Sequence, residues 1–233
     1  MRNYDFSPLW RSTIGFDRLF DLVETAQRAV RLGIDGFEIH AAHGYLLHQF
    51  LSPIANQRTD QYGGSLQNRM RFPLEVFDAV RAAFPADRPV GIRVSSTDWI
   101  EGGWDLAQTI EFAQELKKRG VDWIDASSGG VSPLQKIPLG PSYQVPFAQA
   151  IREATGLTTI AVGLITEAKQ AEEIVASGKA DMVALARGML YDPRWGWHAA
   201  AELGGTVDAP PQYWRSQPST QKALFGATTF GTR

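Results

Sequence analysis

The amino-acid sequence predicts an α/β fold of about five parallel strand–helix units. Short apolar runs, each long enough for one buried strand, alternate with stretches whose apolar residues recur at helical spacing. Hydrophobic residues make up 44% of the 233 residues and charged residues 21%, the balance of a globular domain with a sizeable core. Strands that are buried on both faces and separated by helices are typical of a parallel sheet with crossover connections.

The order of the expected elements follows from these patterns and from the residues that end them. Helices are expected at 16–32, 65–84, 105–119, 147–155, 168–177 and 193–203. Ser65 is placed to cap the second helix, and glycines at 33, 120 and 178 end the first, third and fifth. Strands are expected at 34–40, 89–95, 121–127, 158–162 and 181–186. A long loop that contains Tyr62-Gly63-Gly64 precedes the second helix.

Polar residues gather just past the ends of the expected strands. They are His40, Arg93, Ser127 with Ser128, Gly163 and Arg187. An eight-fold strand–helix barrel carries its functional residues on this carboxyl rim, and a doubly wound open sheet binds its ligand at the same strand ends. The pattern alone therefore leaves both folds open. Eight units need on the order of 250 residues, and five are visible here. No GxGxxG follows a strand and no GxxxxGK[ST] loop is present, which weakens the dinucleotide-fold and P-loop readings.

Charge and composition narrow the class of protein. The net charge is −2, whereas nucleic acid or an anionic membrane favours a basic partner. No apolar run approaches the roughly 18–20 residues of a membrane span, and the N-terminus lacks the apolar core of a secretory signal. The chain has no cysteine, and hence no disulfide and no thiolate nucleophile. A cytoplasmic protein without a nucleic-acid or membrane partner is expected.

The segment that follows the first strand carries the clearest chemistry. His40, His43 and Tyr45 place two imidazoles and a phenol near one point. Such a group can hold a carbonyl or phenolate oxygen with two N–H donors while a hydroxyl delivers a proton. A pair of structural histidines, or half of a metal site, fits the same spacing. A metal needs a third ligand, and neither His48 nor His198 has a helpful spacing, so no metal is expected.

Arginine and glycine recur where a barrel would hold an anion. Arg93 lies inside an apolar strand and needs either an internal salt bridge or the anionic edge of a cofactor as its partner. Gly163 follows the fourth strand, and Ala186-Arg187-Gly188 follows the fifth. The last two loops of a barrel commonly build a phosphate site, so these residues favour one.

Several segments resemble one known family. They are 36–72 (GFEIHAAHGYLLHQFLSPIANQRTDQYGGSLQNRMRF), 91–95 (GIRVS), 124–130 (IDASSGG), 161–166 (AVGLIT), 184–193 (ALARGMLYDP) and the tail 209–215 (APPQYWR). Together they resemble the Old Yellow Enzyme family of FMN-dependent ene-reductases, in its bacterial, thermophilic-like branch. The resemblance selects the barrel and implies a partial TIM (β/α)8 barrel that comprises strands 4–8 of the family fold.

The resemblance also implies an activity and a set of residues. The family binds FMN without a covalent bond, reduces it with NAD(P)H and transfers hydride to the β-carbon of an enone or nitroalkene. Tyr45 would be the proton donor, and His40 and His43, with Ala41 and Ala42 between them, would bind the substrate. Arg93, Ser127, Gly129, Gly163, Ala186 and Arg187 would contact FMN. Arg215 would reach the substrate site of a neighbouring subunit, which implies a homo-oligomer.

The start of the chain departs from the family. The family has three strand–helix units before the matching segments, whereas residues 1–24 resemble the opening of bacterial small heat-shock proteins. The sequence therefore predicts a leader at 1–24, a partial FMN-binding barrel at 25–205 and a tail at 206–233. The alternative function is that of an inactive barrel segment that self-associates through its open sheet edges.

Overall fold

Five parallel strands form a single open sheet in this computed structural model, which describes residues 17–226 and 228. The strands are β1 (Phe37–Ala41), β2 (Val90–Ser95), β3 (Trp123–Ser127), β4 (Thr158–Ala161) and β5 (Met182–Val183). Their order across the sheet is their order along the chain, and every neighbouring pair is parallel. The predicted α/β class and the five parallel units are confirmed.

The two faces of the sheet differ because side chains alternate along each strand. Ile39, Ile92, Ile124 and Ala161 are buried on the face that the helices cover, and they form the centre of the main core. On the other face the register aligns polar residues, since His40 lies opposite Arg93 and Arg93 lies opposite Asp125. This second face corresponds to the inner wall of a barrel.

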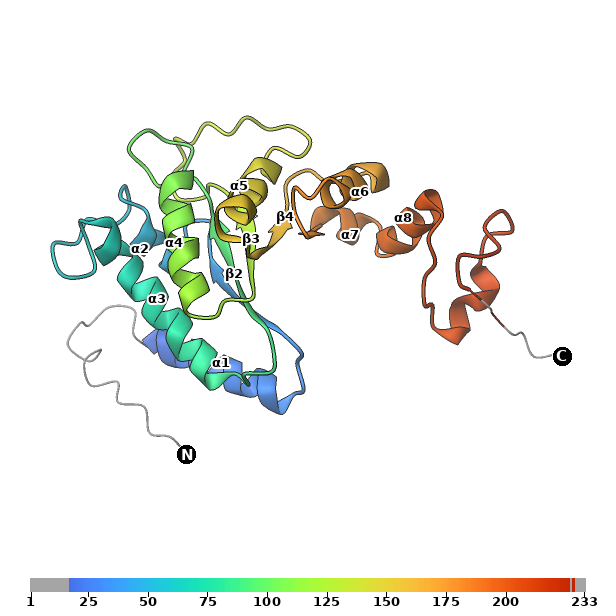
Figure 1. Cartoon of the computed structure of the whole chain (residues 1–233), viewed down its shortest axis with the longest axis horizontal. Helices are drawn as coiled ribbons and strands as arrows, with labels where there is room; N and C mark the ends of the chain where they lie inside the picture. Colours follow the sequence, from blue (N-terminus) through green and yellow to red (C-terminus); the bar gives the residue numbers. More distant parts are fainter. Residues whose placement is uncertain (1–16, 227, 229–233) are drawn as a thin grey trace.

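Helices pack against one face of the sheet (Figure 1). They are α1 (Asp17–Arg31), α2 (Leu46–Leu51), α3 (Leu66–Ala83), α4 (Leu106–Lys118), α5 (Val145–Thr155) and α6 (Ala168–Ala176). The Ser65 side chain accepts a hydrogen bond from the Asn68 N–H and begins α3 as predicted, and Asp105 does the same for α4 through Gln108. The short helix α2 lies inside the segment that the sequence predicts to be a loop.

The last elements extend away from the sheet as an arm (Figure 1). The arm comprises α7 (Arg187–Tyr191), α8 (Trp195–Leu203) and the 3-10 helix η2 (Pro211–Ser216). A second, smaller cluster holds it together, in which Ala209, Leu224 and Phe225 pack against Trp197 of α8. Arg194 lies over the rings of both Trp197 and Tyr213, at 4.8 and 4.3 Å from the ring centroids.

Near the carboxyl end, one expected strand is shorter than predicted and one helix is additional. The strand expected at 181–186 pairs only over Met182–Val183, because the chain turns into α7 at Arg187. The helix expected at 193–203 is α8, and the additional short helix α7 precedes it and ends at Tyr191, just before Asp192 and Pro193. Proline has no N–H and disfavours helical backbone at the residue before it, and Asp192 accordingly is extended (φ −125°, ψ 90°).

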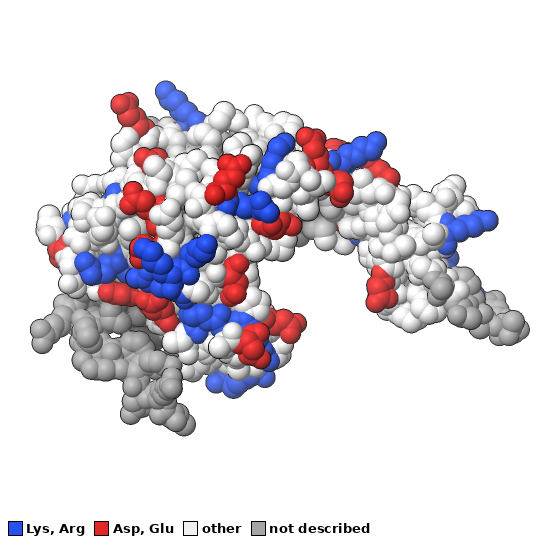
Figure 2. All heavy atoms as spheres, in the orientation of Figure 1, with Lys and Arg blue, Asp and Glu red and all other residues white. Residues whose placement is uncertain are grey.

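The predicted leader lies mostly outside the described residues, which begin at 17. Helix α1 runs without a break across the expected boundary at 24 and 25, and it packs against α3. Within the part of the chain that the structure describes, no helix has the length and apolar character of a membrane span. On the face drawn in Figure 2, basic and acidic side chains are interspersed over the helices.

Candidate functional site

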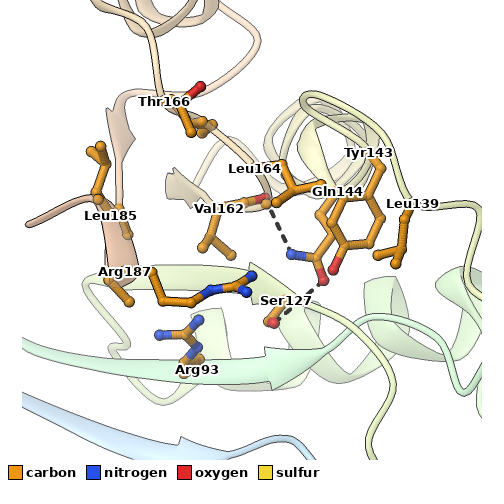
Figure 3. A pocket seen from close by; sticks show the side chains of 15 residues that line it. Arg93, Ser127, Leu139, Tyr143, Gln144, Val162, Leu164, Thr166, Leu185 and Arg187 are labelled. Carbon is orange, nitrogen blue, oxygen red and sulfur yellow. Dashed lines mark hydrogen bonds between the residues drawn. The ribbon is translucent and has the colours of Figure 1, made fainter. Parts of the chain in front are cut away.

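A cavity of about 390 Å³ opens at the carboxyl ends of β2 to β5 (Figure 3). Five of the predicted cofactor residues line it, namely Arg93, Ser127, Gly163, Ala186 and Arg187. The side chains of Tyr143 and Gln144 and the loop from Val162 to Thr166 complete its wall. Strand ends from four neighbouring units therefore converge on one space, as the parallel sheet requires.

The cavity is suited to an anionic ligand. Arg93 and Arg187 both extend their guanidinium groups into it (Figure 3). The N–H groups of Ala186 and Arg187 stand at the start of α7, where no preceding turn supplies acceptors, and they donate to no carbonyl of the described chain. Backbone N–H groups and guanidinium groups are the donors that phosphate prefers.

Gly163 shapes the wall of this cavity. Its φ is +121°, a region that residues with a side chain rarely adopt, and an added Cβ would lie 2.8 Å from Nε2 of Gln144. Gln144 is itself buried, and its Nε2 donates to the Val162 carbonyl at 3.3 Å. The glycine thus lets the loop after β4 pass close to Gln144 while its backbone faces the cavity.

Arg93 forms a salt bridge with a buried carboxyl group. Its Nη1 lies 3.3 Å from Oδ2 of Asp125, which is only 3% exposed. Neither Arg93 Nε nor Asp125 Oδ1 has a hydrogen-bond partner among the residues from 17 to 226. Burial raises the pKa of Asp125 to about 7, although the neighbouring Arg93 acts to lower that pKa. The internal salt bridge that the sequence allowed is present. Arg93 also borders the cavity, and its contact with the anionic edge of a cofactor stays a prediction.

His40, His43 and Tyr45 form one cluster at the end of β1. The His40 ring centroid lies 5.3 Å from that of His43 and 5.3 Å from that of Tyr45. Tyr45 is 63% exposed. Burial and the nearby Arg93 lower the pKa of His43 to about 4, and they also lower the pKa of His40. His43 is therefore a neutral imidazole near neutral pH.

Ser127 connects this cluster to the cavity. Its Oγ lies 2.6 Å from Nε2 of His43 and 3.4 Å from Oε1 of Gln144. Ser128 also hydrogen-bonds Gln144 and accepts from Nε1 of Trp99 at 2.8 Å. The two groups of predicted residues are thus parts of one site rather than two separate ones.

Four of the predicted residues lie apart from the open site. Ala41 and Ala42 are fully buried, so only their backbone is near His40 and His43. Gly129 has a φ of +69° and donates to the Thr97 carbonyl, outside the cavity wall. Arg215 is exposed in η2, at the far end of the arm (Figure 1).

Sequence reasoning missed other residues of the site. Asp125, Tyr143 and Gln144 each lie at the cavity or directly behind it, and His48 supports the turn that carries His43. Asp125 could have been found from the sequence, because it is an acid inside an apolar strand. It stands two residues before Ser127 and therefore on the same face of that strand. Gln144 could not, because its role depends on how the loop before α5 folds back.

The fold and the cavity define a parallel α/β protein with a cationic ligand site at the carboxyl ends of its strands, an arrangement consistent with part of a strand–helix barrel. The family model described as NADH:flavin oxidoreductase / NADH oxidase matches residues 18–204. The chain belongs to this family. Membership implies FMN as the flavin of this family.

Curated relatives agree with the family. The chain is 50% identical over 190 residues to an NADPH dehydrogenase of Geobacillus sp. (strain WCH70), an alignment that covers 82% of this chain and 55% of the relative. It is 47% identical over 192 residues to an NADPH dehydrogenase of Bacillus subtilis (strain 168), covering 82% and 56%. The chain spans about half the length of these relatives.

Solved structures support the same barrel architecture. Morphinone reductase superposes with a TM-score of 0.67 at 32% identity, over 94% of this chain and 55% of that protein. A 2-naphthoyl-CoA reductase in complex with 2-naphthoyl-CoA superposes with a TM-score of 0.73 at 28% identity, over 81% of this chain and 29% of that one. The five-stranded sheet is therefore consistent with part of a closed barrel.

The residues present fit a bound FMN. The flavin nucleotide carries a phosphate and a polar pyrimidine edge, and the cavity offers Arg187 with free backbone N–H groups at one wall and Arg93 at another. The orphaned Nε of Arg93 is a donor without an acceptor in the described chain. No group of three or more His, Asp or Glu side chains in that same part is arranged to hold a metal.

Proposed function

We propose that this chain binds FMN in the cavity and, with NAD(P)H as reductant, reduces the activated C=C bond of an enone or nitroalkene. The observation that carries the proposal is the junction at Ser127, which lines the cationic cavity and also contacts His43. A flavin in the cavity and a substrate at the histidines would lie next to each other. The family membership and the NADPH dehydrogenase relatives support the same activity.

The cavity residues have distinct proposed roles. The Arg187 side chain and the N–H groups of Ala186 and Arg187 would hold the phosphate, with Gly163 lining its approach. Arg93 would contact the pyrimidine edge of the ring system. Positive charge at that edge favours the reduced, anionic flavin. When bound, FMN would accept hydride from NAD(P)H and deliver it to the β-carbon of the alkene.

The histidine cluster has the complementary proposed role. His40 and His43 would donate N–H groups to the carbonyl or nitro oxygen of the substrate, and the backbone at Ala41 and Ala42 would form the floor below it. Tyr45 would give its hydroxyl proton to the α-carbon. His43 Nε2 contacts Ser127, so a substrate oxygen would be held by its other nitrogen or would displace the serine contact.

A titration of the full chain with FMN tests the proposal. Flavin fluorescence should be quenched at micromolar protein, and NAD(P)H should then bleach the bound flavin. Arg187→Ala should weaken FMN binding by about tenfold or more, since it removes a charge-assisted phosphate contact. Lys169→Ala is the matched control, because Lys169 is an exposed cation on α6 outside the cavity and should leave the affinity unchanged. Absence of quenching would overturn the proposal.

A second proposal concerns assembly. One side of β1 has no neighbouring strand in the described part of the sheet, and the arm presents Arg215 to solvent. Both features support a homo-oligomer, either one in which Arg215 serves a neighbouring subunit or an inactive self-associating form. Sedimentation of the full chain distinguishes these outcomes when combined with the FMN titration, and a stable monomer would contradict both.

We propose the cytoplasm as the location of this protein, since NAD(P)H is available there.

A further inference from the structure

His48 connects the substrate-binding turn to a buried carboxylate. It lies on α2 and is fully buried. Its Nδ1 accepts a hydrogen bond from the Gly44 N–H at 2.9 Å, and its Nε2 lies 2.8 Å from Oδ1 of Asp98. A backbone N–H can only donate, so Nδ1 carries no proton, and Nε2 is the protonated nitrogen that donates to Asp98.

Asp98 is held by three donors. Besides His48, it accepts from Oγ of Ser52 at 2.7 Å and from the Trp104 N–H at 2.7 Å, and it is fully buried. Burial acts to raise the pKa of Asp98, but the hydrogen bonds from His48, Ser52 and Trp104 outweigh it, so the pKa lies below its usual value. A carboxylate in this position fixes which nitrogen of His48 bears the proton.

The turn at the other end needs such support. His43 and Gly44 both have left-handed backbone, with φ of +58° and +76°. For a residue with a side chain this conformation costs on the order of 1 kcal/mol and persists only where surrounding contacts hold it. The two N–H groups of the turn both donate to buried side chains, that of His43 to Ser95 at 3.0 Å and that of Gly44 to His48.

The turn also has no room to relax toward the neighbouring loop. A Cβ on Gly44 would lie 2.3 Å from the Gly130 carbonyl oxygen, and one on Gly130 would lie 2.5 Å from Cα of His43. The backbone of the turn is therefore fixed by close contact on one side and by the His48 hydrogen bond on the other. Gly44 stands between His43 and Tyr45, so its orientation sets where both side chains point.

We propose that His48 is a positioning residue for substrate binding, which holds the Gly44 N–H and so aims His43 and Tyr45, with Asp98 keeping its Nδ1 free to accept. The role of His43 and Tyr45 rests on the proposed function, whereas the support of the turn does not. Histidine suits the place because it combines an acceptor near its Cβ with a donor at its far end.

Three substitutions separate the two hydrogen bonds. Asn has an acceptor close to the position of Nδ1, so His48→Asn should keep the Gly44 bond and lose the contact with Asp98. Gln places its donor near Nε2, so His48→Gln should do the reverse. His48→Leu removes both bonds and keeps an apolar side chain in the core. If positioning acts through Gly44, His48→Asn should behave like the wild type in the tests below.

Amide hydrogen exchange on the full chain tests the link to the turn without any flavin. Exchange at Gly44 should be about tenfold faster in His48→Gln and His48→Leu than in the wild type and in His48→Asn. The Ser52 amide is the internal control, because it donates to the backbone carbonyl of His48 at 2.9 Å and should be indifferent to the side chain. Equal Gly44 exchange in the wild type and in His48→Leu, relative to Ser52, would overturn the proposal.

Kinetics with added FMN test the link to substrate. His48→Leu should raise KM for cyclohexenone about tenfold while the FMN dissociation constant stays the same, and His48→Asn should restore KM. If KM across the His48 variants correlates with the melting temperature and not with the exchange rate at Gly44, His48 acts only through core packing, which would contradict the proposal. If FMN does not bind at all, the proposed function fails, and the exchange experiment still decides the role of His48.

Discussion

Arg93 and Asp125 lie opposite each other on β2 and β3, with Nη1 of the arginine 3.3 Å from Oδ2 of the aspartate. The pair is on the inner face of the sheet, and Arg93 borders the cavity. The net charge of the pair depends on one proton, because Asp125 is buried and burial raises its pKa to about 7. Glu38 on β1 also faces this pair and opposes ionisation of Asp125.

The first prediction concerns the pH dependence of stability. The pKa of Asp125 is higher in the folded chain than its ordinary value of 3.8, so its contribution to stability is full below pH 3.8 and is lost as the pH rises through about 7. Relative to Asp125→Asn, the wild type should lose on the order of 2 kcal/mol of unfolding free energy between pH 5 and pH 8. Urea unfolding at both pH values measures this.

An exposed pair provides the control for that prediction. Asp78 forms an ion pair with Arg119 at 3.4 Å on the outer helices, and its side chain is 54% exposed. The urea curves of Asp78→Asn and of the wild type should therefore differ by a nearly constant amount across the same pH range. If Asp125→Asn also runs parallel to the wild type, Asp125 is ionised throughout and the pair is a simple salt bridge.

The second prediction separates the two half-reactions at Tyr45. Only alkene reduction needs a proton at the α-carbon, so Tyr45→Phe should slow that half-reaction by about 100-fold or more and leave flavin reduction by NAD(P)H nearly unchanged. Stopped-flow absorbance of the flavin follows each step. Tyr191→Phe is the matched control, because Tyr191 is 94% exposed on α7. Equal slowing of both steps would contradict the role of Tyr45 as proton donor.

The third prediction follows from the neutral His43. Its pKa is lowered from 6.5 to about 4, mainly by burial, so the unfolded chain takes up a proton that the folded chain refuses as the pH falls through this window. The wild type should lose roughly 1–2 kcal/mol of stability at pH 5 relative to pH 7 that His43→Gln does not lose. His40 also acts to lower the pKa of His43. Replacing both histidines should therefore reduce this pH-dependent loss of stability by less than the sum of the two single reductions. Parallel pH profiles for the wild type and His43→Gln would disprove a lowered pKa.

The strand and helix order was predictable because each unit carries its own local pattern. Apolar runs and helical stripes mark β1 to β4 and α3 to α6, and these elements lie within a few residues of their expected positions. The exceptions are short elements that the spacing of apolar residues does not reveal. Pro193 divides α7 from α8, and α2 is a single short helix inside a loop.

The site was predictable only where its residues share a segment or a strand end. His40, His43 and Tyr45 are close in sequence, and their rings are close in space. The partners of these residues are far away along the chain, since His43 meets Ser127 and His48 meets Asp98. Such pairs depend on the strand register and on how loops fold over the sheet, and one sequence does not encode them as a local pattern.

On the inner face of the sheet, the position of the Trp123 side chain depends on glycine at position 91. The Trp123 indole lies across β2 and donates its Nε1 hydrogen to Oε2 of Glu38 on β1 at 2.8 Å. A Cβ on Gly91 would fall 2.0 Å from Cε2 of that ring, which leaves space for no residue but glycine while the indole stays in place. One tryptophan thus spans three strands because the middle one has no side chain at this position.

The last prediction is that Gly91→Ala destabilises the chain by roughly 1–3 kcal/mol, because the indole must move and its bond to Glu38 is lost. Trp123→Leu removes the obstacle, so the double variant Gly91→Ala with Trp123→Leu should be more stable than the sum of the single effects predicts. Urea unfolding of the four proteins gives this coupling. Gly196→Ala is the control, since a Cβ there would meet nothing within 4 Å and alanine favours the helix α8. Additive effects at positions 91 and 123 would mean that the indole is not held over Gly91.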